Sequence, residues 1–132
     1  MNSKLNEIVI GIGSNINPKI NIKKAKELIS LKVKILKISS FIETEPLEVK
    51  KQNNFINGSI LIKTDMNKNA LKFWLRNLED KLGRMRTSNK YGPRTIDLDI
   101  LVWNGEVVDG DVYKRSFLRS SMKELLPDLK LP

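Results

Sequence analysis

Four runs of apolar residues along the chain have the length and the β-branched content of strands. We predict these strands over residues 5–12, 33–44, 55–62 and 96–103. Asn104 and Gly105 follow the last run and favour a tight hairpin turn. Residues 45–54 are polar and include Pro46, so we expect a loop between the second and third strands.

Apolar residues at helical spacing fill the two longer intervals between these strands. The first helix is expected to begin at Asn17–Pro18, because proline suits the first helical position, and its stripe is Ile22, Ala25, Leu28 and Ile29. The second is expected to be capped by Thr64 or Asp65 and to end at Gly83, with a stripe of Leu71, Trp74, Leu75, Leu78 and Leu82. A short helix over residues 121–126 is predicted before Pro127.

The order of these elements, β-α-β-β-α-β, is that of the ferredoxin-like arrangement. We therefore predict an α+β sandwich in which an antiparallel sheet carries both main helices on one face. The 132 residues are few enough for one domain, and we expect a single domain over residues 1–132.

The composition narrows the chemistry that is open to this chain. It has no histidine and no cysteine, which excludes an imidazole base, a thiolate nucleophile, a disulfide and a zinc site built from these residues. Carboxylate, amine, guanidinium and hydroxyl groups remain, and hard cations bound by oxygen are the plausible metals. The amino-terminal residues are polar and no apolar run approaches the roughly 20 residues of a membrane helix, so we expect a cytoplasmic protein that binds no membrane and works as a monomer.

The net charge of +9, from 24 basic and 15 acidic residues, suggests anionic partners. The lysines are dispersed along the chain, as on a solvated surface. The arginines are clustered instead: none occurs before Arg76, and Arg84, Arg86 and Arg94 lie within eleven residues.

The segment that carries the clearest chemistry follows the second predicted helix. Residues 81–96 contain five cations and no carboxylate, and Asp97 and Asp99 come directly afterwards in a predicted strand. Alternation puts both carboxylates on one face, where they repel each other unless a cation lies between them. Mg²⁺ suits such a pair, and the arginines could bind phosphate oxygens. The alternative is that Arg84 and Arg94 merely form salt bridges with the two aspartates at the end of the sheet.

The segment from Tyr91 to Ile100, Tyr-Gly-Pro-Arg-Thr-Ile-Asp-Leu-Asp-Ile, resembles the signature of the 6-hydroxymethyl-7,8-dihydropterin pyrophosphokinases. Further segments match in order and approximate spacing, at residues 11–15, 39–47, 52–57 and 78–84, so that the resemblance covers most of residues 8–129. It implies a ferredoxin-like fold and the transfer of diphosphate from ATP to the hydroxymethyl group of the pterin, with release of AMP, in folate biosynthesis.

The resemblance also implies roles for individual residues. Asp97 and Asp99 would hold two Mg²⁺ ions, and Arg84 and Arg94 would act in catalysis. The residues implied to bind ATP are Glu79, Arg84, Arg94, Ile100 and Arg115. Those implied to bind the pterin are Thr44, Leu47, Phe55, Asn57 and Phe117. Phe55 and Phe117 would stack on the two faces of the ring, although without the resemblance both could simply belong to the core.

The chain departs from the family pattern in residues 107–115, a stretch that is several residues shorter than usual and lacks a histidine. This departure supports an alternative function, a relative that binds pterin or nucleotide with little or no catalysis. A small RNA-binding domain of the same topology is a further alternative, suggested by the net charge. Aromatic residues make up only 6% of the chain and the aromatic strand signature of such domains is absent, so we expect small-molecule substrates and no nucleic acid.

Overall fold

The computed structural model describes residues 4–46, 52–84 and 95–132. The strands are β1 (Asn6–Ser14), β2 (Lys34–Ile38), β3 (Ile42–Thr44), β4 (Phe55–Thr64), β5 (Asp97–Trp103) and β6 (Glu106–Val107). The helices are α1 (Pro18–Ser30), α2 (Lys68–Lys81), α3 (Asp111–Lys114) and α4 (Ser116–Leu125). This mixed arrangement around an antiparallel sheet confirms the predicted α+β, ferredoxin-like fold.

The sheet is built around β1. The strand order is β2-β4-β1-β5-β6, and β3 pairs with β4 beyond the end of β2. Strand β1 runs antiparallel to both of its neighbours, and its register with β5 shifts between Val9 and Ile10, which indicates a bulge. Most residues of β1 are buried, because helices cover both faces of the sheet around it.

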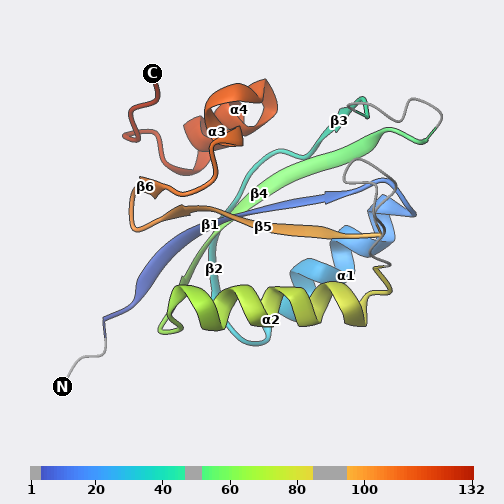
Figure 1. The fold of residues 1–132 in the computed structure, drawn as a ribbon, viewed down its shortest axis with the longest axis horizontal. Helices are drawn as coiled ribbons and strands as arrows, with labels where there is room; N and C mark the ends of the chain where they lie inside the picture. The colour runs from blue at the N-terminus through green and yellow to red at the C-terminus, as the bar shows by residue number, and fades with distance from the viewer. Residues whose placement is uncertain (1–3, 47–51, 85–94) are drawn as a thin grey trace.

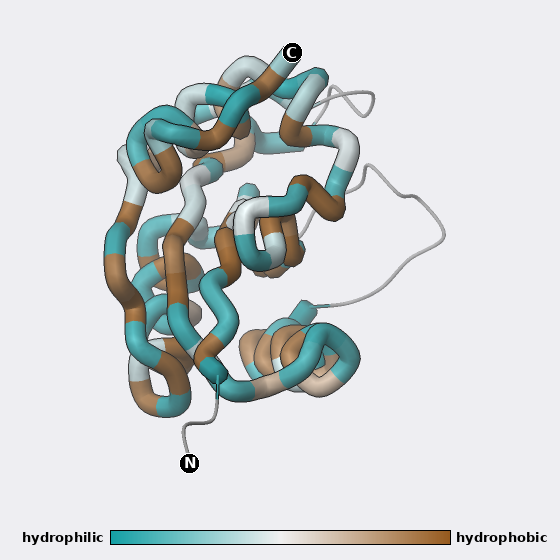
Figure 2. Tube along the Cα trace, turned by 90° about the vertical axis from the view of Figure 1, so that its left-hand side faces the viewer, coloured by the Kyte–Doolittle hydropathy of each residue, from teal (hydrophilic) through white to brown (hydrophobic). Residues whose placement is uncertain are grey.

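Two helical layers enclose the sheet. Helices α1 and α2 lie on one face, as predicted, and α3 and α4 lie on the other (Figure 1). Each face has its own hydrophobic core, and Figure 2 shows hydrophobic stretches along the strands between the layers. The core under α1 and α2 includes Ile10, Ile60 and Leu75, whereas the core under α4 includes Val9, Leu61 and Met122. Alternate residues of the same strands thus feed opposite cores, as the pleat requires.

The predicted strand over residues 33–44 is broken into β2 and β3, which corrects the sequence interpretation. The backbone and hydroxyl of Ser39 both bond to the backbone of Ser59, and Ser40 donates twice to the carboxylate of Glu124 on α4. The ring of Phe41 covers Gly58, where a Cβ atom would lie within 3.0 Å of the ring. Contacts with distant segments therefore set the break.

Two helix boundaries also differ from the prediction. The cap of α2 is Asn67, whose side chain accepts a hydrogen bond of 2.8 Å from the backbone of Ala70, whereas Thr64 still belongs to β4. Helix α4 begins at Ser116 instead of Ser121, and the short helix α3 precedes it. Polar residues before Ser121 made the helical spacing hard to recognise in the sequence. The buried residues of α4 are Leu118, Ser121, Met122 and Leu125. The predicted hairpin is confirmed, since Asn104 and Gly105 have φ angles of 48° and 82° between β5 and β6.

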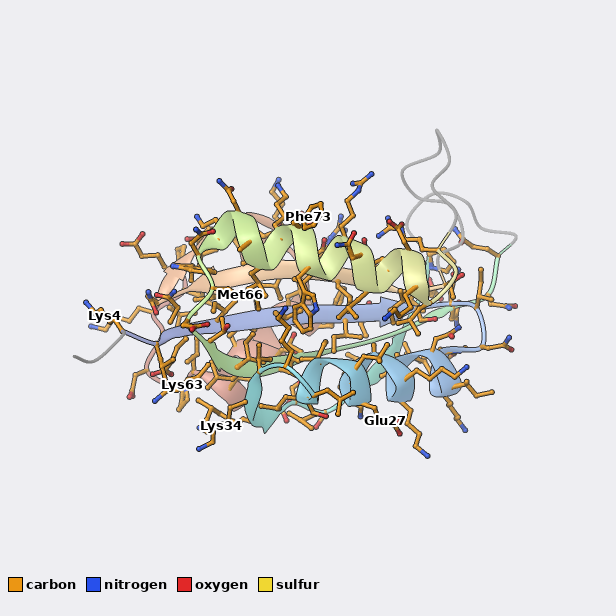
Figure 3. All side chains as sticks on the ribbon, turned by 90° about the horizontal axis from the view of Figure 1, so that it is seen from below. Lys4, Glu27, Lys34, Lys63, Met66 and Phe73 are labelled. Atoms are coloured by element: carbon orange, nitrogen blue, oxygen red, sulfur yellow. The ribbon has the colours of Figure 1, made fainter. Side chains whose placement is uncertain are left out.

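Positive charge is present at the end of the molecule where Lys4, Lys34 and Lys63 lie (Figure 3). Lys34 and Lys63 are partners in the register of β2 and β4. This end lies away from the carboxyl end of α2, where the candidate site is found. Within the described part of the chain, no helix has the length and apolar content needed to span a membrane.

Candidate active site

Two rows of register partners run across β4, β1 and β5, on the face of the sheet that α4 partly covers. Gly13 is the register partner of Asn57 on one side and of Asp97 on the other, and Gly11 is likewise flanked by Ser59 and Asp99. Neighbouring strands lie about 4.8 Å apart, so Asn57 and Asp97 are about 10 Å apart at their backbones. Because β1 contributes only glycines to these rows, no side chain rises between the flanking residues.

A cavity of about 540 Å³ lies above Gly11 and Gly13 of β1. It is within the size range typical of small-molecule sites. Its walls come from β1, β3, β4, β5 and the segment from Asp109 to Leu118. Eight of the residues predicted from the sequence line it: Thr44, Phe55, Asn57, Arg84, Asp97, Asp99, Arg115 and Phe117. Leu47 and Arg94 lie outside the described residues.

The two predicted stacking residues reach the cavity from distant parts of the chain. Phe55 begins β4 and is half-buried, and it belongs to neither hydrophobic core. Phe117 lies in the first turn of α4 and packs against the core under that helix while it lines the cavity. Both rings are therefore available to a flat ligand, and Phe117 also has a structural role.

The amide of Asn57 lines the same cavity as the two aromatic side chains. Its Nδ2 donates a hydrogen bond to Oγ1 of Thr44, which lies opposite Phe55 in the pairing of β3 with β4. The amide is half-buried and lines the cavity. It still offers an acceptor oxygen and one N–H donor, the pattern needed to recognise a cyclic amide.

The carboxylates of Asp97 and Asp99 lie on one face of β5, as alternation predicted. Although Asp99 opens into the cavity, the protein around its carboxyl group disfavours the charged form, and the neighbouring charge of Asp97 adds to this effect. Together with a hydrogen bond to the side chain of Asp97 and weaker repulsion from Asp109 and Glu79, these causes raise the pKa of Asp99 to about 8. The two carboxylates therefore repel each other when both are charged.

This donor set fits a hard divalent cation. Two carboxylates provide the oxygen ligands that Mg²⁺ prefers, and a cation between them would relieve their repulsion. In the described ranges, no group of three or more acidic, histidine or cysteine side chains forms a complete metal cage. A bound Mg²⁺ would thus take its remaining ligands from water and from the substrate, as is common for this ion.

Glu79 connects α2 to this region. Its side chain is only 8% exposed, and its Oε2 accepts hydrogen bonds from the backbone of Leu98 at 2.8 Å and from Nη1 of Arg84 at 2.7 Å. The same nitrogen of Arg84 lies 3.0 Å from Oδ1 of Asp97. The salt bridge that the sequence left open as an alternative is therefore present between Arg84 and Asp97, and it places a guanidinium group against one carboxylate of the pair.

A second hollow of about 470 Å³ lies on the other side of this cluster. Asn69, Lys72, Phe73 and Arg76 of α2 form its outer wall. Phe73 is 68% exposed and projects from the outer side of α2 (Figure 3). The two hollows share Arg84, Asp97 and Asp99, so the charged cluster lies between two spaces that could hold two different ligands.

Some site features were not anticipated from the sequence. The glycines of β1 carry no side-chain signal, although a Gly-x-Gly at the end of a strand is a hint of close approach by a ligand or a neighbouring group. Glu45, Asp109 and Asp111 also line the larger cavity. Ile100 lines neither hollow and packs against the core under α1 and α2, so its implied contact with ATP stays a prediction.

Comparison with known proteins identifies the family. Residues 9–127 match the family described as 7,8-dihydro-6-hydroxymethylpterin-pyrophosphokinase, HPPK. The chain belongs to this family. It is 33% identical over 127 residues to the 2-amino-4-hydroxy-6-hydroxymethyldihydropteridine pyrophosphokinase of Bacillus subtilis, covering 88% of this chain and 75% of that protein. It is 31% identical over 134 residues to the protein of the same name from Haemophilus influenzae, covering 93% and 83%.

Other HPPK relatives are much longer proteins. The folic acid synthesis protein fol1 of Pneumocystis carinii is 34% identical over 142 residues, which cover 99% of this chain but only 19% of that protein. The folate synthesis bifunctional protein of Arabidopsis thaliana is similarly covered over only 27% of its length. The chain therefore matches a part of these relatives.

Proposed function

We propose that this chain transfers diphosphate from ATP to the hydroxymethyl group of 6-hydroxymethyl-7,8-dihydropterin, with AMP as the second product. The observation that carries the proposal is that two aromatic side chains, an amide and a carboxylate pair line one and the same cavity. Membership of the HPPK family supports the choice of these two substrates.

The pterin would occupy the larger cavity. Phe55 and Phe117 offer stacking surfaces for its flat ring, and the amide of Asn57 offers hydrogen bonds to the amide-like edge of the pyrimidine. With that edge held over β4, the hydroxymethyl group at the far end of the ring would reach across the glycines of β1 toward Asp97. The separation of about 10 Å between the backbones of Asn57 and Asp97 suits a bicyclic substrate.

ATP would then approach from the second hollow. Its phosphates would lie at the shared cluster, where Arg84 is available from the segment after α2. Arg115, which precedes α4, is available from the wall of the larger cavity. Its nucleoside end would extend along α2, where Phe73 provides an exposed ring and Arg76 a cation. Arg94 stays a proposed phosphate ligand on the strength of the sequence resemblance.

The reaction is an in-line displacement at the β-phosphorus. The substrate oxygen forms a bond to the β-phosphorus, the bond from that phosphorus to the bridging oxygen of the α-phosphate breaks, and the hydroxyl proton is released. Asp97 and Asp99 would hold Mg²⁺, which when bound supplies charge neutralisation at the transferred phosphates. Arg84 and Arg115 would add donors to the developing negative charge, so the absence of histidine is no obstacle to this chemistry.

The test is the release of AMP from ATP with and without 6-hydroxymethyl-7,8-dihydropterin, each in the presence and absence of Mg²⁺. We expect AMP only when pterin and Mg²⁺ are both present. Asp97→Ala and Asp99→Ala should abolish this release while pterin binding persists, and Asp65→Ala, an exposed aspartate in the turn before α2, serves as the matched control. AMP release that does not depend on the pterin, or full activity in either aspartate variant, would contradict the proposal.

A further inference from the structure

We infer that Gly13 is a positioning residue for pterin recognition, because only a residue without a side chain leaves room there for the amide of Asn57. This inference rests on the proposed function in so far as Asn57 is taken to bind the pterin. Its physical basis is independent of the substrate and lies in the packing between β1 and β4.

The two residues are register partners, and their side-chain positions point to the same face of the sheet. A Cβ atom added at Gly13 would lie within 3.0 Å of Oδ1 of Asn57, a distance that real Cβ atoms do not tolerate. The clash is the same if the two ends of the amide are exchanged, because its oxygen and nitrogen are of similar size. The amide therefore occupies the space that a side chain at position 13 would need.

The clash could be relieved by a shift of the strands or by a rotation of the Asn57 amide, and these two movements have different consequences. Apart from the residues that flank Gly13, the nearest backbone atom to the added Cβ is the carbonyl oxygen of Ile56 at 3.8 Å, which is an ordinary contact distance. Only the end of a flexible side chain stands in the way, so the strands can keep their places while the amide of Asn57 rotates. Rotation would break its hydrogen bond to Thr44 and would turn its donor and acceptor away from their present directions.

Gly13 and Thr44 thus hold the amide from two sides. Thr44 fixes Nδ2 by a hydrogen bond, and Gly13 allows Oδ1 to lie low over β1. Gly11, two residues along the same face, has a different neighbour, because a Cβ atom there would lie 3.0 Å from Cδ1 of Leu101 and does not meet the amide. The positioning role consequently belongs to Gly13 and is not shared by every glycine of the strand.

The experiment is a double-mutant cycle with Gly13→Ala and Asn57→Ala, read out as the dissociation constant for 6-hydroxymethyl-7,8-dihydropterin measured by calorimetry. We expect Gly13→Ala alone to weaken binding by about 3- to 10-fold, the worth of one misplaced hydrogen bond. In the Asn57→Ala background the added methyl group has no amide to displace, so Gly13→Ala should cause no further loss. The Michaelis constant for ATP should change less than that for the pterin.

Each outcome separates the inference from the proposed function. If the wild-type chain does not bind the pterin, the proposed function fails. If the wild-type chain binds it and Gly13→Ala binds equally well, or if the two losses simply add, the positioning role is overturned. Thermal unfolding of the four proteins gives an independent reading, because a loss of stability in Gly13→Ala that persists in the double variant would show a clash with the backbone and would also overturn it.

Discussion

Nη1 of Arg84 lies 3.0 Å from Oδ1 of Asp97, so a cation of the protein itself is in contact with one of the two carboxylates proposed to hold a metal. The same nitrogen contacts Glu79 at 2.7 Å, which keeps Arg84 near the cluster from a second direction. The side chain of Arg84 is 17% exposed and lines both hollows. It is therefore held at the point where the phosphates of ATP would meet the pterin.

Arg84→Ala should lower the turnover number for AMP release by about 10²- to 10³-fold, because a positioned donor to the transferred phosphates is lost. Pterin binding should change little, since the stacking and amide contacts remain. Steady-state kinetics with separate titration of each substrate measures both effects. Arg119→Ala is the matched control, because Arg119 bonds to the carbonyl of Tyr113 and does not line either hollow. Equal turnover in the two variants would remove Arg84 from the mechanism.

The raised pKa of Asp99 predicts a pH-dependent stability in metal-free protein. Its ordinary pKa of 3.8 applies to the unfolded chain, and the folded value is about 8. Between these values the folded state holds a proton that the unfolded state releases, so the stability present below pH 4 is lost as the pH rises through 8. The variant Asp99→Asn cannot charge and escapes this loss.

Thermal unfolding in the presence of a chelator tests this prediction. We expect the melting temperature of Asp99→Asn minus that of the wild type to increase from pH 4 to pH 8 and then to level off. Added Mg²⁺ should reduce the difference at pH 8 by binding the charged form of the wild type. A difference that is constant across this range would show that Asp99 titrates near its ordinary value.

Phe117→Ala should weaken pterin binding by roughly 1–3 kcal/mol, because one stacking surface and its apolar contact area are lost. It should also lower the stability of the protein, since Phe117 packs against the core under α4. Phe55→Ala should weaken binding with less effect on stability, because Phe55 belongs to neither core. Calorimetric titration and chemical unfolding separate the two effects, and Phe73→Ala, in the other hollow, should leave pterin affinity as in the wild type.

Glu79→Ala should destabilise the protein by about 1–3 kcal/mol, because the buried N–H of Leu98 loses its acceptor. Glu79→Gln keeps an oxygen for that N–H and loses only the charge that faces Arg84, so its loss should be smaller. Urea unfolding of both variants measures the difference. Equal losses would show that the ion pair with Arg84, and not the hydrogen bond to Leu98, accounts for the contribution of Glu79 to stability.

Much of the fold follows from the periodicity of the apolar residues. The alternation in β5 places Asp97 and Asp99 on one face, and the stripes of α1 and α2 face the same core, as predicted. The break between β2 and β3 could not be foreseen, because Ile38 and Ile42 continue a strand-like pattern and the break depends on Ser59 and Glu124 far along the chain. Propensity describes local preference, and here distant contacts override it.

The sequence predicts those parts of the candidate site whose residue types and spacing point to a particular chemistry. The carboxylate pair and the arginine cluster carry such a signal, whereas pairing Phe55 with Phe117 required the family resemblance. Glu79 has the sequence context of a helix-surface acid, and its burial arises only because α2 packs beside β5. Gly13 leaves space for the amide of Asn57, and the sequence cannot show this because it depends on the pairing of β1 with β4.

The carboxylate of Glu79 also covers part of an open edge of the sheet. One side of β5 pairs with β1, and on the other side β6 pairs only with Val102 and Trp103. In the described part of the chain, the first residues of β5 therefore form an open edge of the sheet. Such borders invite pairing with strands of other molecules and thus aggregation. Glu79 accepts the N–H of Leu98 at this border, so this donor is not available to an incoming strand. The contact that holds Arg84 beside the site therefore also discourages edge-to-edge association.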